Sequence, residues 1–146
     1  MRGLNNNVGL LLGDAKIIEV LKDAGLRPTK QRICVGRLLF TGKHQHVSAD
    51  RLQLQIRELG QKMALATIYN CLHQFHNAGL LKKVNAVNDV IMFDTNLSYH
   101  HHFLNVDTGE LTDINKEAVS IAGLPALPDG FEALSMELTI RVKPQI

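Results

Sequence analysis

The sequence predicts an α+β protein with two small domains, the first mainly helical and the second mainly built from strands. Over the first half of the chain, apolar residues recur at steps of three and four, the spacing of helices that bury one face. Two strand-like runs, LLKKVNAV and DVIMFD, follow around Asn88-Asp89, a hairpin turn signal. Strand-like segments and turns fill the rest, so we expect domains at residues 1–95 and 96–146.

Turn and capping residues divide the helical part into segments. Asp14 is placed to cap a first helix that ends at Gly25. Pro28 disfavours helix at Arg27, and Thr29 can cap the second helix. The segment KHQHV is expected to form a loop or a short strand before the third helix.

Ser48 is expected to cap the third helix, which ends at Gly60, and a fourth helix is predicted over residues 65–77. The apolar residues of the fourth helix share one buried stripe: Leu65, Ile68, Leu72 and Phe75. Its other faces carry Thr67, Tyr69, Asn70, His73 and Gln74, and the Thr, Tyr, Asn and Gln side chains suit contacts with base edges. Helices followed by a two-stranded hairpin are the order of a winged helix-turn-helix, with residues 65–77 offered to the major groove.

The net charge of +2 is divided unevenly along the chain. Residues 1–95 hold 13 Lys and Arg against 7 Asp and Glu, a net charge of +6, and residues 96–146 hold 3 against 7, a net charge of −4. This division indicates that only the first half meets a polyanion, although chance variation of surface charge is the alternative. Together with the order of the elements, it predicts DNA binding.

The second domain is expected to dimerise. Residues 100–114 predict two strands around Thr108-Gly109, residues 115–124 a short helix, and residues 131–144 a long strand. Three strands and one helix bury little apolar surface on their own. A second copy is therefore expected to cover the aliphatic residues Val106, Leu111, Ile114, Leu138 and Ile140. A two-fold dimer would also present two DNA-reading helices to two half-sites.

Three consecutive histidines begin the first strand of this domain. On a strand, His100 and His102 point to one face, and His101 points to the other together with Tyr99. One metal ion cannot easily bind all three, so the two faces are expected to serve different purposes. The alternative is a polar strand edge without any ligand.

Four segments resemble the ferric uptake regulator superfamily over nearly the full chain: GLRPTKQR, HVSADRL, ATIYNCLHQFHNAGLL and HHHFLNVDTGE. Within it, the sequence looks most like the iron response regulator branch of rhizobia and their relatives. There HHH replaces the more usual His-Asp-His, and members respond to haem as well as iron. The resemblance implies a dimeric transcription factor that binds AT-rich operators.

The resemblance also assigns DNA contacts. Tyr69 matches the tyrosine of the recognition helix. Asn70 stands where relatives carry an arginine that contacts a base, and the change from arginine to asparagine favours adenine over guanine. Arg27 matches a basic residue that probes the minor groove, and Arg32 and Ser48 match positions that hold phosphates. For each arginine, a solvated surface charge is the alternative.

A regulatory metal site between the two domains is implied as well. Its matching residues are His46, Asp94, His102 and Asp113, two imidazoles and two carboxylates that suit Fe(II), Mn(II) or Zn(II). A metal ion there would fix the angle between the domains and so control operator binding. The CxxC zinc clamp of the family is replaced by NVDT, so no structural zinc is expected.

Haem is the second effector that the resemblance implies. The candidate ligands are His100, His101 and His102, because neutral imidazole is an ordinary axial ligand of haem iron. The Cys-Pro haem motif of some relatives is absent, since no proline follows Cys34 or Cys71. A haem-delivering protein would then be a partner.

The sequence thus predicts a haem- or iron-responsive transcriptional regulator that is not an enzyme. A plain metal- or peroxide-sensing repressor of the same superfamily is the alternative. The competing class is a metalloenzyme that uses the histidines with Asp107 or Asp113, but no activated nucleophile, phosphate loop or HExxH pattern accompanies them. No apolar run reaches the roughly 20 residues of a spanning helix, so a cytoplasmic protein without membrane contact is expected.

Overall fold

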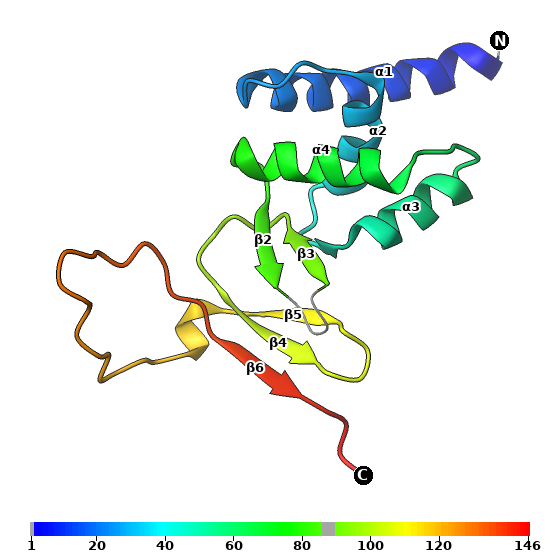
Figure 1. The fold of residues 1–146 in the computed structure, drawn as a ribbon. Coiled ribbons are helices and arrows are strands. Elements are labelled where there is room, and N and C mark those ends of the chain that lie inside the picture. The colour runs from blue at the N-terminus through cyan, green and yellow to red at the C-terminus, as the bar shows by residue number, and fades with distance from the viewer. Residues whose placement is uncertain (1, 86–89) are drawn as a thin grey trace. The chain divides into compact units, whose positions relative to one another are not determined.

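The computed structural model describes residues 2–85 and 90–146, which form two compact units (Figure 1). The first unit contains residues up to 85 and residues 90–97, and the second contains residues 98–146. The predicted turn at Asn88-Asp89 lies outside the described residues. The predicted α+β fold class is confirmed by the order of helices and strands.

The first unit combines a group of helices with a small antiparallel sheet (Figure 1). The helices are α1 (Arg2–Asp23), α2 (Lys30–Leu39), α3 (Ala49–Glu58) and α4 (Leu65–Asn77). The strands are β1 (His46–Val47), β2 (Lys82–Asn85) and β3 (Ile91–Asp94), in the order β1-β3-β2. This is the architecture of a winged helix-turn-helix, with β2 and β3 as the wing.

Two predicted helix caps are confirmed. The Thr29 hydroxyl oxygen accepts the backbone N–H of Arg32 at 3.3 Å, and the Ser48 hydroxyl oxygen accepts the backbone N–H of Arg51 at 3.2 Å. Each bond satisfies one of the N–H groups that the first turn of a helix leaves open. Helices α2 and α3 therefore begin where the sequence indicates, and α4 has the predicted bounds.

The predicted start of the first helix at Asp14 is wrong. Helix α1 begins at Arg2, so Asp14 lies inside it. The Asp14 carboxylate instead accepts two hydrogen bonds from Arg37 of α2, at 2.5 Å from Nε and 2.6 Å from Nη2. These bonds lower the pKa of the Asp14 carboxyl and raise the pKa of Arg37. A residue that looked like a cap joins two helices.

The core of the first unit draws on every helix and on the sheet. Its fully buried side chains include Leu21, Val35, Leu39, Leu52, Ile56, Ile68, Leu72, Phe75 and Phe93. Three residues of the predicted α4 stripe belong to this core, and Leu65 packs against it partly buried. The stripe therefore fixes which face of α4 turns away from the core.

The second unit is a three-stranded sheet. Strand β4 (His101–Asn105) lies in the middle, between β5 (Leu111–Ile114) and β6 (Thr139–Val142). Strands β4 and β5 form an antiparallel hairpin, and β6 runs parallel to β4. The hairpin turn contains Gly109 at φ 75°, a conformation that glycine adopts without strain.

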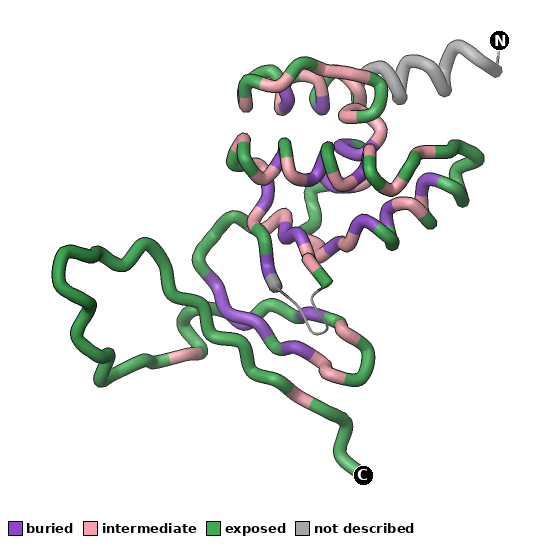
Figure 2. Tube along the Cα trace, viewed as in Figure 1, coloured by how far each residue is buried: buried purple, intermediate pink, exposed green. Residues whose placement is uncertain are grey.

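Two predictions for the second unit are wrong in extent. Only a 3-10 turn, η2 (Lys116–Ala118), forms within the predicted helix 115–124, and the predicted strand 131–144 shrinks to β6. The chain from 120 to 138 runs outside the sheet and is exposed along its length (Figures 1 and 2). Its apolar side chains include Leu124, Leu127, Phe131 and Leu134. Helices and strands in proteins are stabilised mainly by packing an apolar face against other residues. In the single chain, residues 120–138 pack against no such surface, and they form neither the predicted helix nor the predicted long strand.

No helix among the described residues is both long enough and apolar enough to cross a membrane.

Candidate nucleic-acid interface and metal centre

The outward face of α4 carries a ridge of exposed residues. Ala66, Asn70 and Gln74 are exposed and lie four residues apart, so their side chains stand one turn above another. Thr67 and Tyr69 are partly buried beside the ridge, and the Tyr69 ring stacks on His73 at 6.2 Å between ring centres. Of the predicted reading residues, Asn70 is thus the one most open to solvent.

Arg32 is not a freely solvated charge. Its Nε and Nη2 donate to the Oε1 atom of Gln74 at 3.1 and 2.9 Å. Its Nη1 donates to the backbone carbonyl of Arg27 at 2.8 Å. Arg32 therefore ties α2 to the recognition helix and to the loop that carries the exposed Arg27 side chain. The sequence prediction placed Gln74 on an outer face of the helix but could not show its contact with Arg32.

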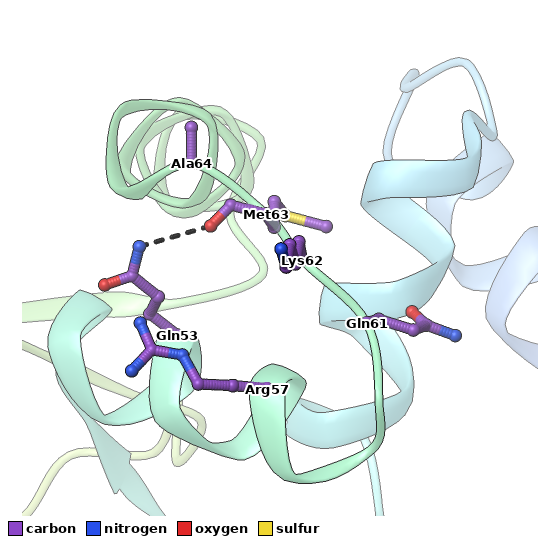
Figure 3. Close-up of a pocket in the computed structure, with 6 residues that line it drawn as sticks. All are labelled: Gln53, Arg57, Gln61, Lys62, Met63 and Ala64. Atoms are coloured by element: carbon purple, nitrogen blue, oxygen red, sulfur yellow. Dashed lines mark hydrogen bonds between the residues drawn. The ribbon is translucent and has the colours of Figure 1, made fainter.

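A cavity of about 340 Å³ opens beside the start of α4 (Figure 3). Its lining residues are Gln53, Arg57, Gln61, Lys62, Met63 and Ala64. Gln53 Nε2 donates to the Met63 carbonyl at 3.2 Å, which holds α3 against the turn before α4. Ala64 stands at the N-cap and offers no side-chain bond to the first turn. Two cations and uncapped N–H groups make this end of α4 suited to an anion such as phosphate.

In the first unit, His46 and Asp94 face each other. They are register partners across β1 and β3, and His46 Nε2 lies 3.1 Å from Asp94 Oδ2. Asp94 is fully buried, and its Oδ1 accepts the backbone N–H of Asn96 at 2.8 Å. The structure therefore brings together the two metal-ligand candidates that the resemblance assigned to this domain.

In the second unit, His100, His102 and Asp113 form a cluster. The Nε2 atoms of His100 and His102 lie 3.3 and 3.4 Å from Asp113 Oδ1, and the two rings are 4.5 Å apart. The prediction that His100 and His102 share a face is confirmed. His102 and Asp113 pair across β4 and β5, so the sheet register sets the cluster.

The position of the ring hydrogen of His100 bears on whether this cluster suits a metal ion. His100 Nδ1 lies 2.6 Å from the Ser98 carbonyl, which can only accept, so the ring hydrogen is on Nδ1. The Nε2 atom of His100 then faces the carboxylate oxygen of Asp113. Either a hydrogen on Nε2 or a metal ion between the two atoms satisfies both groups, and both histidines are buried. A backbone carbonyl behind Nδ1 is the usual arrangement of a ligating histidine.

His101 has a different partner. It points to the other face, with its ring 5.0 Å from that of Tyr99 and at 79° to it, as predicted. Its Nδ1 accepts the backbone N–H of Leu138 at 2.9 Å, which leaves the ring hydrogen on Nε2. Neither nitrogen then has a lone pair for haem iron, and the residue is 1% exposed. His101 therefore does not fit as an axial haem ligand in this arrangement.

The two cysteines are not activated thiols. Cys71 is buried in the core of the first unit, and Cys34 is partly buried with its Sγ 3.4 Å from Gln61 Oε1. Burial raises the pKa of both thiols. They stay protonated at neutral pH and are poor nucleophiles.

Comparison with known proteins gives a consistent picture. Residues 23–141 match the ferric uptake regulator family. The chain is 32% identical over 102 residues to a ferric uptake regulation protein of Vibrio anguillarum, covering 69% of this chain and 68% of that one. It is similar to the manganese-bound ferric uptake regulator of Pseudomonas aeruginosa, with 28% identity, a TM-score of 0.66 and coverage of 89% and 98%. The Vibrio cholerae ferric uptake regulator gives 25% identity, a TM-score of 0.68 and coverage of 87% and 98%.

These findings define a winged-helix transcriptional regulator with a small C-terminal α/β dimerisation domain. The chain belongs to the ferric uptake regulator family. It is accordingly a metal-responsive, DNA-binding regulator, and the proteins of this family bind DNA as dimers and are not enzymes. The predicted superfamily resemblance is confirmed at this level.

Proposed function

We propose that this protein is an iron-responsive transcriptional regulator of the iron response regulator type, which binds AT-rich operators as a homodimer. Its affinity for DNA would change when a divalent metal binds. The observation that carries the proposal is the cluster of His100, His102 and Asp113, in which two buried imidazoles converge on one oxygen of a partly exposed carboxylate. Membership of that branch rests on the HHH sequence in and before β4.

The DNA-binding part of the proposal uses the outward face of α4. Tyr69 and Asn70 would read base edges in the major groove, with Thr67 beside them, and Asn70 would favour adenine because an amide can donate to N7 while accepting from the N6 amino group. Arg27 would enter the minor groove, and Ser48 and Arg32 would hold phosphates. Arg32 uses three of its five N–H donors within the protein, which leaves two for a phosphate.

The metal-binding part of the proposal joins ligands from both units. His46 and Asp94 offer an imidazole and a carboxylate, and His102 and Asp113 offer the same pair, with His100 as a further imidazole. Neither set alone completes the coordination shell of a transition metal. One ion bound by both would hold the two units in a single arrangement, and this is how metal could control operator binding. The mixed nitrogen and oxygen donors suit Fe(II), Mn(II) or Zn(II).

The dimeric part of the proposal uses the second unit. Phe103 and Ile140 are register partners on neighbouring strands, and Leu138 precedes Ile140 by two residues, so the three share one face. All three are more than a third exposed in the single chain. A second copy placed on this face would bury them. Leu138 and Ile140 are among the residues that the sequence prediction expected a second copy to cover, whereas Leu111 and Ile114 of that set are already buried in the single chain.

Haem is not carried into this proposal. His101 would have to release the Leu138 N–H before its ring could bind iron, and His100 and His102 face Asp113. A haem-delivering partner is therefore not proposed either. A plain metal- or peroxide-sensing repressor remains the second candidate, because the same ligands would serve it. A regulator of this kind would act in the cytoplasm, where bacterial DNA lies.

Metal binding by the untagged full-length protein tests the proposal. We expect one Mn(II) per chain in equilibrium dialysis, and His102→Ala should weaken binding by on the order of 10-fold or more, since even loss of a residue that orients a ligand costs about 10–100-fold. His44→Ala is the control, because His44 is exposed in the loop before β1. Equal affinity in His102→Ala and the parent protein would reject the site.

A further inference from the structure

The side chain of Gln74 is held in one orientation by Arg32. Two guanidinium N–H groups, on Nε and Nη2, converge on the Gln74 side chain at 3.1 and 2.9 Å. A guanidinium has no acceptor, so the amide atom that faces it must be the oxygen. Both lone pairs of that oxygen are then used, and the amide NH2 group is the part of Gln74 left to contact a ligand.

The guanidinium of Arg32 has a second anchor besides Gln74. Its Nη1 donates to the Arg27 carbonyl at 2.8 Å, and that carbonyl also accepts the backbone N–H of Thr29 at 3.0 Å. The backbone N–H of Arg32 donates to the Thr29 hydroxyl in the cap of α2. The loop before α2 therefore helps to hold the guanidinium in the orientation that contacts Gln74.

Gln74 lies where a base or backbone of DNA would be met. It is exposed on the ridge of α4, one turn beyond Asn70 and two turns beyond Ala66. Asn70 has no comparable clamp among the described hydrogen bonds, so its amide can turn either way. Two amides on one ridge thus differ in what they offer: Asn70 a donor and an acceptor, Gln74 donors alone.

We propose that Gln74 is a specificity-determining residue that reads hydrogen-bond acceptors, and that Arg32 is the positioning residue that makes it so. This rests on the proposed role of α4 as the reading helix. Adenine is normally recognised by an amide that donates to N7 and accepts from N6. With its oxygen occupied, Gln74 cannot accept from N6. It favours bases whose major-groove edge presents acceptors, guanine through N7 and O6 or thymine through O4, and disfavours adenine.

The test is a comparison of base preferences. Full-length, Mn(II)-loaded protein would select its operator from a random duplex library, and single-base variants of that operator would then be titrated by fluorescence anisotropy. We expect one position in each half-site at which adenine is disfavoured by the parent protein. Gln74→Ala should abolish the preference at that position. Arg32→Ala should make adenine acceptable there, a shift of about 5- to 150-fold in relative affinity, the equivalent of 1–3 kcal/mol.

Two further variants separate orientation from charge and folding. Arg32→Lys keeps the positive charge but not the paired N–H groups, so it should shift the preference toward adenine as Arg32→Ala does. Gln74→Glu keeps an acceptor for Arg32 but removes the outward donors, so binding should weaken without any gain for adenine. Gln31→Ala, at the exposed neighbour of Arg32 on α2, is the control and should leave the profile unchanged.

Each outcome assigns success or failure to a particular claim. If Arg32→Ala and Arg32→Lys keep the base preferences of the parent protein, Arg32 does not set the specificity of Gln74 and the inference is overturned. A Gln74→Ala profile identical to that of the parent protein overturns it as well. If Asn70→Ala and Tyr69→Ala also leave every preference unchanged, α4 is not the reading helix, and it is the proposed function that fails.

Discussion

The role of several polar side chains follows from counting their hydrogens. His100 donates from Nδ1 to a carbonyl, so Nε2 is the ring nitrogen left to face Asp113, whereas His101 accepts a backbone N–H at Nδ1. Arg32 can only donate, so it decides which atom of Gln74 turns inward. Adjacent histidines in one sequence motif therefore have different chemistry, because their backbone surroundings differ.

At this scale we predict the effect of removing one base contact. Asn70→Ala should lower affinity for the selected operator by about 1–3 kcal/mol, because a bidentate amide contact of this kind contributes that much discrimination. Non-specific binding, which depends on phosphate contacts, should change little. Asn77→Ala is the matched control, an exposed asparagine at the end of the same helix. Anisotropy titrations with operator and scrambled duplexes give both values; equal losses in the two variants would contradict the prediction.

At the scale of elements, α1 and α2 approach closely at one point. Gly36 is buried in α2, and a Cβ atom added there would lie 2.8 Å from Cγ2 of Ile17 in α1. Ile17 is β-branched, so that methyl group cannot easily rotate away. The absence of a side chain at Gly36 therefore permits the packing of these two helices.

Gly36→Ala should destabilise the first unit by about 1–3 kcal/mol, the usual cost of forcing an extra methyl group into a packed core. Gly13→Ala in α1 is the matched control, because a Cβ atom there meets nothing within 4 Å. It should stabilise the helix by up to about 1 kcal/mol through helix propensity. Thermal unfolding followed by circular dichroism measures both variants. Equal unfolding midpoints for Gly36→Ala and Gly13→Ala would show that the close contact of position 36 with Ile17 does not limit stability.

The Asp14–Arg37 pair should make a small part of the stability depend on pH. The Arg37 bonds hold the pKa of the Asp14 carboxyl below its ordinary value. The pair therefore stabilises the folded state fully when the pH is above the ordinary pKa, and this stability is lost as the pH falls through the lower pKa of the folded state. Because Arg37 is 41% exposed, we expect only about 0.5 kcal/mol. Asp14→Asn should thus lower the unfolding temperature at pH 7 and not at pH 2, whereas Glu19→Gln, elsewhere on α1, should show no such difference.

Elements fixed by local sequence were predictable, and those fixed by distant contacts were not. The caps at Thr29 and Ser48 depend on residues three positions away, and the stripe of α4 on a regular spacing. The Arg32–Gln74 clamp joins residues 42 positions apart, so no local pattern announces it.

The three consecutive histidines also show both kinds of feature, those fixed by local sequence and those fixed by distant contacts. Alternation along a strand placed His100 and His102 on one face and His101 on the other, as the ring contacts confirm. The bond that occupies Nδ1 of His101 comes from Leu138, 37 positions away. Apolar alternation in residues 131–144 predicted a long strand because it could not show that a single chain leaves these residues exposed.

At the scale of the whole molecule, the exposed apolar face of the second unit predicts its dependence on a second copy. Ile140→Asp should give monomers or aggregates in sedimentation velocity, because a buried charge without a partner opposes association. Thr108→Asp is the control: it adds the same charge in the exposed β4–β5 turn, where an aspartate can still accept the Glu110 N–H. A dimer that persists in Ile140→Asp would place the interface elsewhere.

At the same scale, the proposed regulation requires that one metal ion, bound by ligands from both units, sets the affinity for DNA. The most direct measurement is operator affinity as a function of Fe(II) or Mn(II) concentration, for the parent protein and for His102→Ala. We expect metal to change the dissociation constant of the parent protein by at least about 5-fold, the low end of typical coupling between sites, and to leave that of His102→Ala unchanged. The same metal response in both proteins, or none in the parent protein, would contradict it.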